Sequence, residues 1–220
     1  MEYPLTSALT PTCNRRGFFP RAVRCFLCQD YPNLEWIILD DGEEPVSDLI
    51  PVDPRIKYFR VSERQNHGAK MNACFELARG PFGIVFDDDD WYPASRVTRQ
   101  IIPMLENPAV NVTGTSTLYY YRHGEQTAYR YTSPRSTKWL ASIAIRRSAW
   151  LSNRFDSIPE GADYNFQKQM PDGTKVDLFE AGLVVASIHA ANAGRKTLDS
   201  DYKPEPWETI QKLWNAADLR

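Results

Sequence analysis

FGIVFDDDDWYP, residues 82–93, joins a short apolar run to four consecutive aspartates and then to two aromatic residues. The apolar run has the length and composition of a buried strand. Carboxylates this close to one another raise one another's pKa and oppose folding unless a cation neutralises them. An EF-hand is disfavoured, because its alternating acids, central glycine and terminal glutamate are missing. The acidic run, residues 87–90, is therefore either a solvated loop or another kind of metal-binding loop.

The size and charge of the chain limit its domain count and its kinds of binding partner. A chain of 220 residues is long enough for one sizeable core and short for two, so we expect a single domain. A formal net charge of -2 gives no global field that would attract nucleic acid or an anionic membrane. No stretch approaches the roughly 20 apolar residues that span a bilayer. The N-terminus also lacks the basic-then-apolar layout of a signal peptide, so we expect no membrane span and a cytoplasmic location.

Short apolar runs alternate with amphipathic runs in the first half of the chain. This order is typical of a parallel sheet with crossover helices. The predicted strands are residues 5–9, EWIILDDG at 35–42, residues 56–61 and FGIVF at 82–86. The predicted helices cover residues 18–27, 69–79 and 94–105. We therefore predict an α/β fold with a mostly parallel central sheet flanked by helices.

The second half has a different composition. Residues 111–131 are rich in Thr and Tyr around the turn signal RHGEQ, which favours an antiparallel hairpin. WLASIAI at 139–145 and LVVASIH at 183–189 are further predicted buried strands, and residues 207–217 form a predicted amphipathic helix. We divide the domain into residues 1–106, residues 107–200 and a C-terminal helix within 201–220.

Three polar clusters directly follow predicted strands. They are residues 11–16, Asp40 with Asp41, and residues 87–90. In an open α/β sheet, ligands bind at the carboxyl ends of the strands. If these strands are parallel and adjacent, all three clusters face one crevice, which is the predicted binding site.

Four motifs in order resemble the nucleotide-binding half of family 2 glycosyltransferases, the inverting enzymes with the GT-A fold. They are PTCNR at 11–15, WIILDDG at 36–42, NHGAKMNACFELARG at 66–80 and FDDDDWYP at 86–93. Two looser matches follow, PEGADYNF at 159–166 and IHAAN at 188–192. The resemblance implies a GT-A, Rossmann-like fold in which residues 1–106 bind a nucleotide sugar and residues 107–200 form the acceptor side.

The resemblance also implies a divalent cation, Mn²⁺ or Mg²⁺, at the acidic run. Such a cation bridges the phosphates of the donor and stabilises the departing nucleoside diphosphate. Asp87 and Asp89 match the two aspartates of the family's DXD motif, and Asp89 is the expected direct ligand. The register is open by one residue, because Asp88 and Asp90 can substitute in a run of four.

His189 matches a late histidine that binds the metal in this family. An imidazole ligand would favour Mn²⁺ somewhat over Mg²⁺. Alternatively, His189 is satisfied by backbone groups at the end of a strand. Asn192 and Arg195 follow it and are expected to close over the diphosphate.

The donor pocket is expected at the first two strand ends and the second helix. Its expected residues are Pro11, Thr12, Arg15, Asp40, Lys70, Asp87 and Asp88, with Arg64 less firmly placed. Asp40 resembles the residue that accepts a hydrogen bond from the nucleobase, uracil in many members, which implies a UDP-sugar. Asp40 could instead cap the turn before Gly42. Lys70 is expected to meet phosphate or ribose, although lysines on helices are ordinarily solvated.

An inverting transferase needs a general base that takes the proton of the attacking hydroxyl. In the family this base is the aspartate of a Glu-Asp pair followed by an aromatic residue at helical spacing. Asp163 with Phe166 matches that aspartate, so Asp163 is the predicted catalytic base. Ala162 occupies the glutamate position, however, and Glu160 remains the alternative base.

The predicted activity is transfer of a single sugar from a nucleoside diphosphate sugar to a hydroxyl acceptor. The Q-x-x-R-W motif and membrane helices of polymer-forming members are absent from the sequence. The acceptor is a saccharide, or a nucleic acid or phosphorylated compound held by the tyrosines and arginines of the hairpin. The arginines in question are Arg122, Arg130 and Arg135. Alternatively, the tyrosines only reflect β-propensity.

Two other classes stay open. A nucleotidyltransferase would also pair carboxylates with a metal and a nucleotide, but it would release pyrophosphate, and its Gly-rich phosphate loop is missing. A non-catalytic nucleotide-sugar-binding module would keep the donor motifs and lack a working base. Ala162 leaves this second alternative open.

Overall fold

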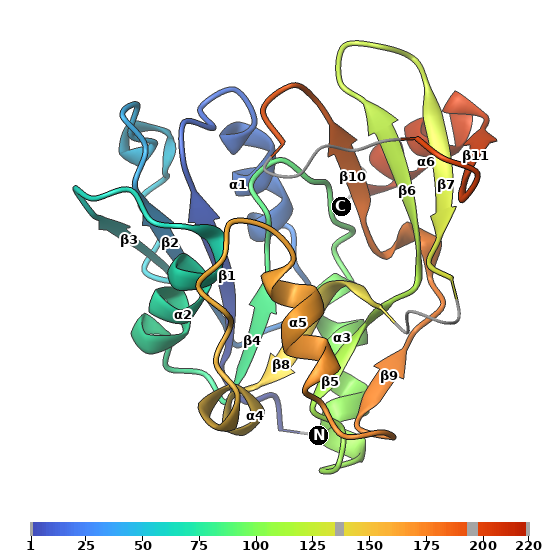
Figure 1. Cartoon of the computed structure of the whole chain (residues 1–220). Helices are drawn as coiled ribbons and strands as arrows, with labels where there is room; N and C mark the ends of the chain where they lie inside the picture. The colour runs from blue at the N-terminus through green and yellow to red at the C-terminus, as the bar shows by residue number, and fades with distance from the viewer. Residues whose placement is uncertain (1, 135–138, 193–197, 219–220) are drawn as a thin grey trace.

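The computed structural model describes residues 2–134, 139–192 and 198–218. The larger of its two sheets has the strand order β3-β2-β1-β4-β8-β5-β9 (Figure 1). These strands are β1 (Thr6–Thr12), β2 (Leu34–Asp40), β3 (Ile56–Arg60), β4 (Phe82–Val85), β5 (Val112–Thr115), β8 (Ala141–Arg146) and β9 (Lys175–Asp177). The neighbours among β1 to β4 pair in parallel, whereas β8 runs antiparallel to β4 and β5. The predicted, mostly parallel central sheet is therefore observed.

Helices cover both faces of this sheet (Figure 1). The helices of the described residues are α1 (Phe19–Leu27), α2 (His67–Leu77), α3 (Arg96–Glu106), α4 (Arg147–Ser152), α5 (Ala162–Lys168) and α6 (Trp207–Asp218), with short 3₁₀ turns η1 (Ser47–Leu49) and η2 (Ala181–Leu183). Within the described residues, no helix combines the length and apolar character needed to cross a bilayer.

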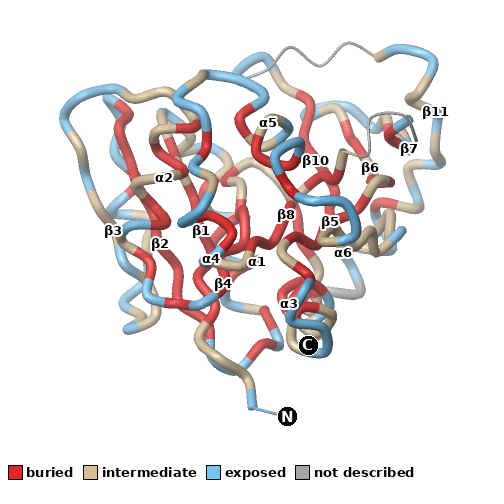
Figure 2. The backbone as a smooth tube through the Cα atoms, turned by 60° about the horizontal axis from the view of Figure 1, so that its bottom comes forward, coloured by how far each residue is buried: buried red, intermediate tan, exposed pale blue. Residues whose placement is uncertain are grey.

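Strand β2 shows why the middle of a central strand, here residues 36–39, is apolar at every position. Trp36 packs in one core cluster with α1, where its ring stacks on Phe26 at 4.8 Å between centroids. Ile37, the next residue, packs with Phe75 of α2 in the second cluster. Every residue of β2 is buried, as the red trace in Figure 2 shows. A strand covered on both faces is therefore mostly apolar, and the two charged residues of β2, Glu35 and Asp40, lie near its ends.

The second sheet lies beside the first and has the order β10-β6-β7-β11. Its strands are β6 (Thr117–Arg122), β7 (Ala128–Thr132), β10 (Val185–Ile188) and β11 (Tyr202–Glu205). The predicted hairpin is present as β6 and β7, which pair antiparallel. Helix α6 packs against one face, where Trp214 contacts Tyr121 with ring centroids 5.3 Å apart.

The hairpin is shorter than predicted, because residues 112–115 leave it and join the larger sheet as β5. The pairing of β5 with β8 is irregular between Thr113 and Thr115. Gly114 allows the close approach, since a Cβ there would lie 2.8 Å from the carbonyl oxygen of Ala141. The chain therefore crosses from one sheet to the other at Ser116.

Helix α2 begins and ends two residues earlier than predicted. It begins at His67 because Asn66 caps it, with Oδ1 accepting the Ala69 amide at 2.9 Å. It ends at Leu77 because Ala78 is extended. The amide of Arg79 is then bound by Glu35 rather than by the helix, at 2.7 Å.

Candidate active site

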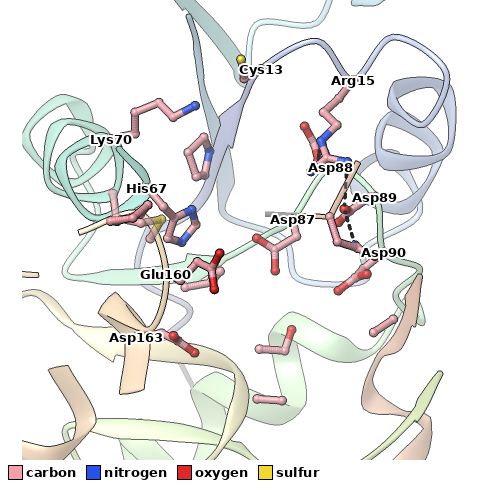
Figure 3. A pocket seen from close by; sticks show the side chains of 18 of the residues that line it. Cys13, Arg15, His67, Lys70, Asp87, Asp88, Asp89, Asp90, Glu160 and Asp163 are labelled. Atoms are coloured by element: carbon pink, nitrogen blue, oxygen red, sulfur yellow. Dashed lines mark hydrogen bonds and ion pairs between the residues drawn. The ribbon is translucent and has the colours of Figure 1, made fainter. Parts of the chain in front are cut away.

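A cleft of about 1110 Å³ opens where the carboxyl ends of β1 and β4 face residues 155–163. The predicted polar clusters at residues 11–16 and 87–90 both contribute to its lining. Across from them stand Glu160 and Asp163, from the start of α5 and the loop before it (Figure 3). The predicted convergence at the strand ends is therefore observed for two of the three clusters.

Three side chains hold the carboxylate of Asp89 in the acidic run. Its Oδ2 lies 2.9 Å from Nε2 of His189 and 3.5 Å from Nη1 of Arg15. Asn192 Nδ2 donates to the same oxygen at 3.4 Å. The acidic run and the late histidine, 100 residues apart, are thus in direct contact. Arg195 lies outside the described residues.

The pKa values of the acidic run diverge. Burial and the charge of Asp89 raise the pKa of Asp88 to about 8, against the hydrogen bond that the Thr12 hydroxyl donates to it. The same two causes raise the pKa of Asp87. Burial would also raise the pKa of Asp89, but the hydrogen bond from His189 and the charge of Arg15 hold it below its usual value. One carboxylate is therefore stably ionised beside two whose ionisation an added cation would favour.

The acidic loop is fastened to β10 by backbone and side-chain bonds. Trp91 and Val185 exchange two backbone hydrogen bonds, at 3.0 and 2.9 Å. The Ser187 amide donates to Oδ1 of Asp90 at 2.9 Å, and the Ser187 hydroxyl donates to the Asp89 carbonyl. Because His189 directly follows this strand, the same pairing brings its ring to Asp89.

Arg96 is a buried cation that the sequence analysis missed. It is fully buried, and its guanidinium lies 3.8 Å from the ring centroid of Tyr92. The Tyr92 hydroxyl in turn accepts the Asp87 amide at 2.9 Å. Tyr92, the second aromatic residue after the aspartates, was the local signal, because the burial of Arg96 follows from packing of α3 under the loop.

The side chains at the acidic run fit a hard divalent cation whose remaining ligands come from a bound substrate. Within residues 2–134, 139–192 and 198–218, no three His, Cys, Asp or Glu side chains form a ready-made metal site. Proteins commonly hold Mg²⁺ through one or two carboxylates while substrate phosphates complete the shell. Asp89 Oδ2 and His189 Nε2 lie 2.9 Å apart. This pair suits a cation that arrives bound to a diphosphate.

Asp40 does not occupy the predicted position. It is fully buried, and it is not among the described residues that line the cleft. Its carboxylate accepts hydrogen bonds from the amides of Gly42 and Val46, at 2.9 and 3.0 Å, and from the Tyr58 hydroxyl at 2.9 Å. Alternation along β2 places Asp40 on the same side as Trp36. Asp40 therefore caps the turn, which is the alternative that the sequence left open.

Lys70 lines the cleft but is already paired. It is 7% exposed, and its Nζ donates to Asp41 at 2.7 Å and to the Thr12 carbonyl at 3.1 Å. Burial would raise the pKa of Asp41, yet the Gln65 amide and Lys70 lower it. Lys70 is therefore neither solvated nor free, and Asp41, rather than Asp40, is the aspartate connected to the cleft wall.

Pro11 and Arg15 line the cleft as predicted, and Thr12 lies just behind it as the last residue of β1. The strand extends three residues beyond its predicted end, so Pro11 and Thr12 belong to the strand rather than to the following turn. His67, which the sequence analysis did not select, also lines the cleft, and its ring points toward Asp87 and Glu160 (Figure 3). Its place directly after the helix cap was the available signal.

Asp163 stands in the first turn of α5 and faces the cleft. Its Oδ2 accepts a hydrogen bond from Nε1 of Trp139 at 3.1 Å. Ala162, at the position of the family glutamate, is fully buried against α2. A Cβ added at Gly68 would lie 3.1 Å from Ala162 Cβ and 1.8 Å from the Asp156 carbonyl oxygen. The close contact with α2 thus favours a small residue at position 162.

Known proteins are similar to this chain in sequence. The family model described as Glycosyl transferase family 2 matches residues 7–164. The putative teichuronic acid biosynthesis glycosyltransferase TuaG of Bacillus subtilis is 23% identical over 224 residues, covering 96% of this chain and 86% of TuaG. An uncharacterized glycosyltransferase of Haemophilus influenzae is 30% identical over 119 residues, covering 52% of this chain. The chain spans 48% of the length of that relative.

Solved structures agree in fold. S. aureus TarS 1–349 in complex with UDP superposes with a TM-score of 0.66 at 14% identity, covering 84% of this chain and 60% of TarS 1–349. The mannosyltransferase PcManGT from Pyrobaculum calidifontis, with GDP-Man and Mn²⁺, gives 0.63 at 14% identity, covering 86% of this chain and 57% of PcManGT. The resemblance inferred from the four motifs is confirmed: the chain belongs to glycosyltransferase family 2 and has the GT-A fold.

Proposed function

We propose that this glycosyltransferase moves a single sugar from a UDP-sugar to a hydroxyl acceptor, with a divalent cation and with inversion at the anomeric carbon. The observation that carries the proposal is the meeting of two groups across one cleft. Asp89 with His189 stands on one side, and Asp163 stands on the other. Solved relatives contain UDP in one case and GDP-Man with Mn²⁺ in another, which supports a nucleotide-sugar donor.

The leaving nucleoside diphosphate belongs on the side of the acidic run. Asp89 and His189 would hold Mn²⁺ or Mg²⁺ there, and the cation would supply charge stabilisation to the departing phosphates. Arg15 contacts both Asp88 and Asp89, at 4.0 and 3.5 Å, so its guanidinium is positioned to meet a phosphate of the donor. Arg64 lines the same cleft and offers a second cationic contact.

The acceptor belongs on the side of α5. Asp163 takes the proton from the acceptor hydroxyl while that oxygen bonds to the anomeric carbon. The bond from that carbon to the diphosphate oxygen breaks, and its electron pair leaves with the nucleoside diphosphate. Trp139 holds Oδ2 of Asp163, which leaves Oδ1 for the hydroxyl.

Identification of the released nucleotide tests this proposal. The purified protein is incubated with a panel of UDP-sugars, Mn²⁺ and simple glycosides, and the products are separated by ion-exchange chromatography. We expect UDP, and an anomeric configuration opposite to that of the donor by NMR. Release of pyrophosphate from a nucleoside triphosphate and a sugar phosphate would support a nucleotidyltransferase instead. Binding of UDP-sugars without turnover by the wild type would support a non-catalytic module.

A further inference from the structure

The smaller sheet presents tyrosines to the cleft on one of its faces. In register, Leu118 lies opposite Tyr131, and Tyr131 lies opposite Tyr202. Residues paired across strands project from the same face of a sheet. Leu118 lines the cleft, so Tyr131 and Tyr202 share the cleft-side face. Tyr120, two residues along β6, lines the cleft as well.

These rings form one continuous set with Trp139, which we call the aromatic platform: Tyr120, Tyr131, Trp139 and Tyr202. Ring centroids lie 6.3 Å apart between Tyr131 and Trp139 and 4.9 Å apart between Tyr131 and Tyr202. Tyr120 and Tyr202 are 5.2 Å apart. Trp139 lines the cleft and donates its Nε1 hydrogen to Asp163 at 3.1 Å. The platform therefore begins at the proposed catalytic base.

One cation of the hairpin, Arg130, is separated from these rings. Arg130 lies opposite Tyr119 and Lys203, so it projects from the other face of the sheet. Arg122 pairs with Glu125 at the hairpin turn, at 3.4 Å. Arg135 lies outside the described residues. Arg130 therefore points to the opposite side from Tyr131 and Tyr202, which argues against a joint grip of Arg130 and these rings on a phosphate backbone.

The charge beside the platform is negative. Asp163 accepts the hydrogen bond of Trp139, and Asp87 and Glu160 line the same cleft. Carboxylates repel an anionic acceptor, whereas they accept hydrogen bonds from neutral hydroxyl groups. Aromatic side chains offer a large apolar face at low cost in conformational entropy. A pyranose ring has an apolar C–H face and a rim of hydroxyls, which is complementary to both features.

We propose that the platform is an acceptor subsite for a neutral saccharide, whose ring stacks on Trp139 and Tyr131 while its attacking hydroxyl meets Asp163. This inference rests on the proposed function. Trp139 serves in two ways, since its ring carries the acceptor and its N–H orients the carboxylate.

Saturation-transfer NMR tests this subsite with defined probes in the presence of UDP and Mn²⁺. The neutral probes are methyl β-glycosides of glucose, galactose and N-acetylglucosamine. Methyl β-glucuronide and oligothymidylate are the anionic probes. We expect saturation of the ring protons of at least one neutral glycoside and weaker signals from both anions. Preferred binding of the glucuronide or the oligonucleotide, or no glycoside signal while UDP still binds, would overturn the proposal.

Substitutions of the platform residues test which rings contact the glycoside. We expect Trp139→Leu to weaken glycoside binding by roughly threefold to tenfold, the usual strength of one aromatic contact, and Tyr131→Leu to act in the same direction. Tyr164→Leu is the matched control, because Tyr164 lies on α5 and is exposed. Trp139→Phe should retain glycoside binding and lower turnover, because it keeps a ring and loses the N–H. Unchanged glycoside binding in both leucine variants would overturn the subsite.

A UDP thermal-shift measurement separates failure of the subsite from failure of the proposed function. We expect every variant to keep its stabilisation by UDP with Mn²⁺. If the wild type itself showed none, the proposed function would fail, and the subsite with it. If Trp139→Leu did not fold, Tyr131→Leu and Trp139→Phe would carry the test.

Discussion

The two sides of the cleft differ in the chemistry of their side chains. On the proposed donor side, buried polar groups are paired with one another, as Lys70 is with Asp41 at 2.7 Å and His189 with Asp89 at 2.9 Å. On the acceptor side, aromatic rings surround one carboxylate, Asp163, which is held by an indole N–H. A diphosphate carries several charges and needs preorganised counter-charges. A neutral sugar needs apolar faces and a few acceptors, so the difference supports the proposed placement of donor and acceptor.

The largest expected effect separates Asp163 from Glu160 on the acceptor side. Asp163→Asn should lower kcat by roughly 10²- to 10⁴-fold, the usual contribution of a general base, and should leave UDP binding intact. Glu160→Gln should change kcat far less, because Glu160 is exposed in the loop before α5. Initial rates of UDP release and calorimetric titration with UDP measure the two quantities. The reverse ranking would assign the base to Glu160.

The next largest effect concerns the close contact between α2 and the segment of residues 156–163. In Gly68→Ala, the new methyl group would lie 1.8 Å from the Asp156 carbonyl oxygen, so residues 156–163 must shift away from α2. We expect a loss of about 1–3 kcal/mol in unfolding free energy and a fall in kcat. Gly17→Ala is the control, because a Cβ at Gly17 meets nothing within 4 Å. Urea unfolding of both variants gives the comparison, and equal stability would contradict the close contact.

A third prediction concerns Glu35, which is buried at the end of the sheet opposite the cleft. Its carboxylate accepts the Ser7 hydroxyl and the Arg79 amide, both at 2.7 Å. Burial would raise the pKa of Glu35, but these hydrogen bonds and the charge of Arg79 lower it. The native state therefore binds fewer protons than the unfolded state, so the stabilisation is present above about pH 4.3 and is lost as pH falls through the native pKa.

Glu35→Gln should lower the free energy of unfolding at pH 7 by about 1–2 kcal/mol. The difference between wild type and variant should shrink as the pH is lowered toward 3. Urea unfolding at a series of pH values measures it. Because Glu35 is remote from the cleft, UDP binding at pH 7 should be unchanged. A difference that stays constant with pH would show that ionised Glu35 is not the stabilising form.

The smallest effect tests the position of Asp40. Tyr58→Phe removes one of the hydrogen bonds to this carboxylate and should cost about 1 kcal/mol of stability. Burial and Asp40 raise the pKa of Tyr58 to about 12, so the hydroxyl is a donor at neutral pH. Nucleotide affinity should not change, because Asp40 lies behind the cleft wall. Weaker UDP binding at unchanged stability would return Asp40 to the nucleobase.

The donor side could be predicted from sequence because its signals are local. An apolar run followed by Asp88 and Asp89 marks a buried strand and its polar end without knowledge of the rest of the chain. Asp40 was misplaced by a single step of strand alternation, which no local pattern fixes. Arg96 and the transfer of residues 112–115 to the larger sheet depend on packing between distant segments. The aromatic platform likewise depends on cross-strand register, so the Tyr and Arg of the hairpin looked like one surface.

Thermal unfolding with UDP and Mn²⁺, added singly and together, tests most directly whether the acidic run and His189 form a metal-dependent nucleotide site. We expect a rise in melting temperature only when UDP and Mn²⁺ are both present, because a ligand that binds only the native state stabilises it by mass action. We also expect that Asp89→Asn still folds but loses this rise. An equal rise without Mn²⁺, or an undiminished rise in Asp89→Asn, would contradict the assignment of the site.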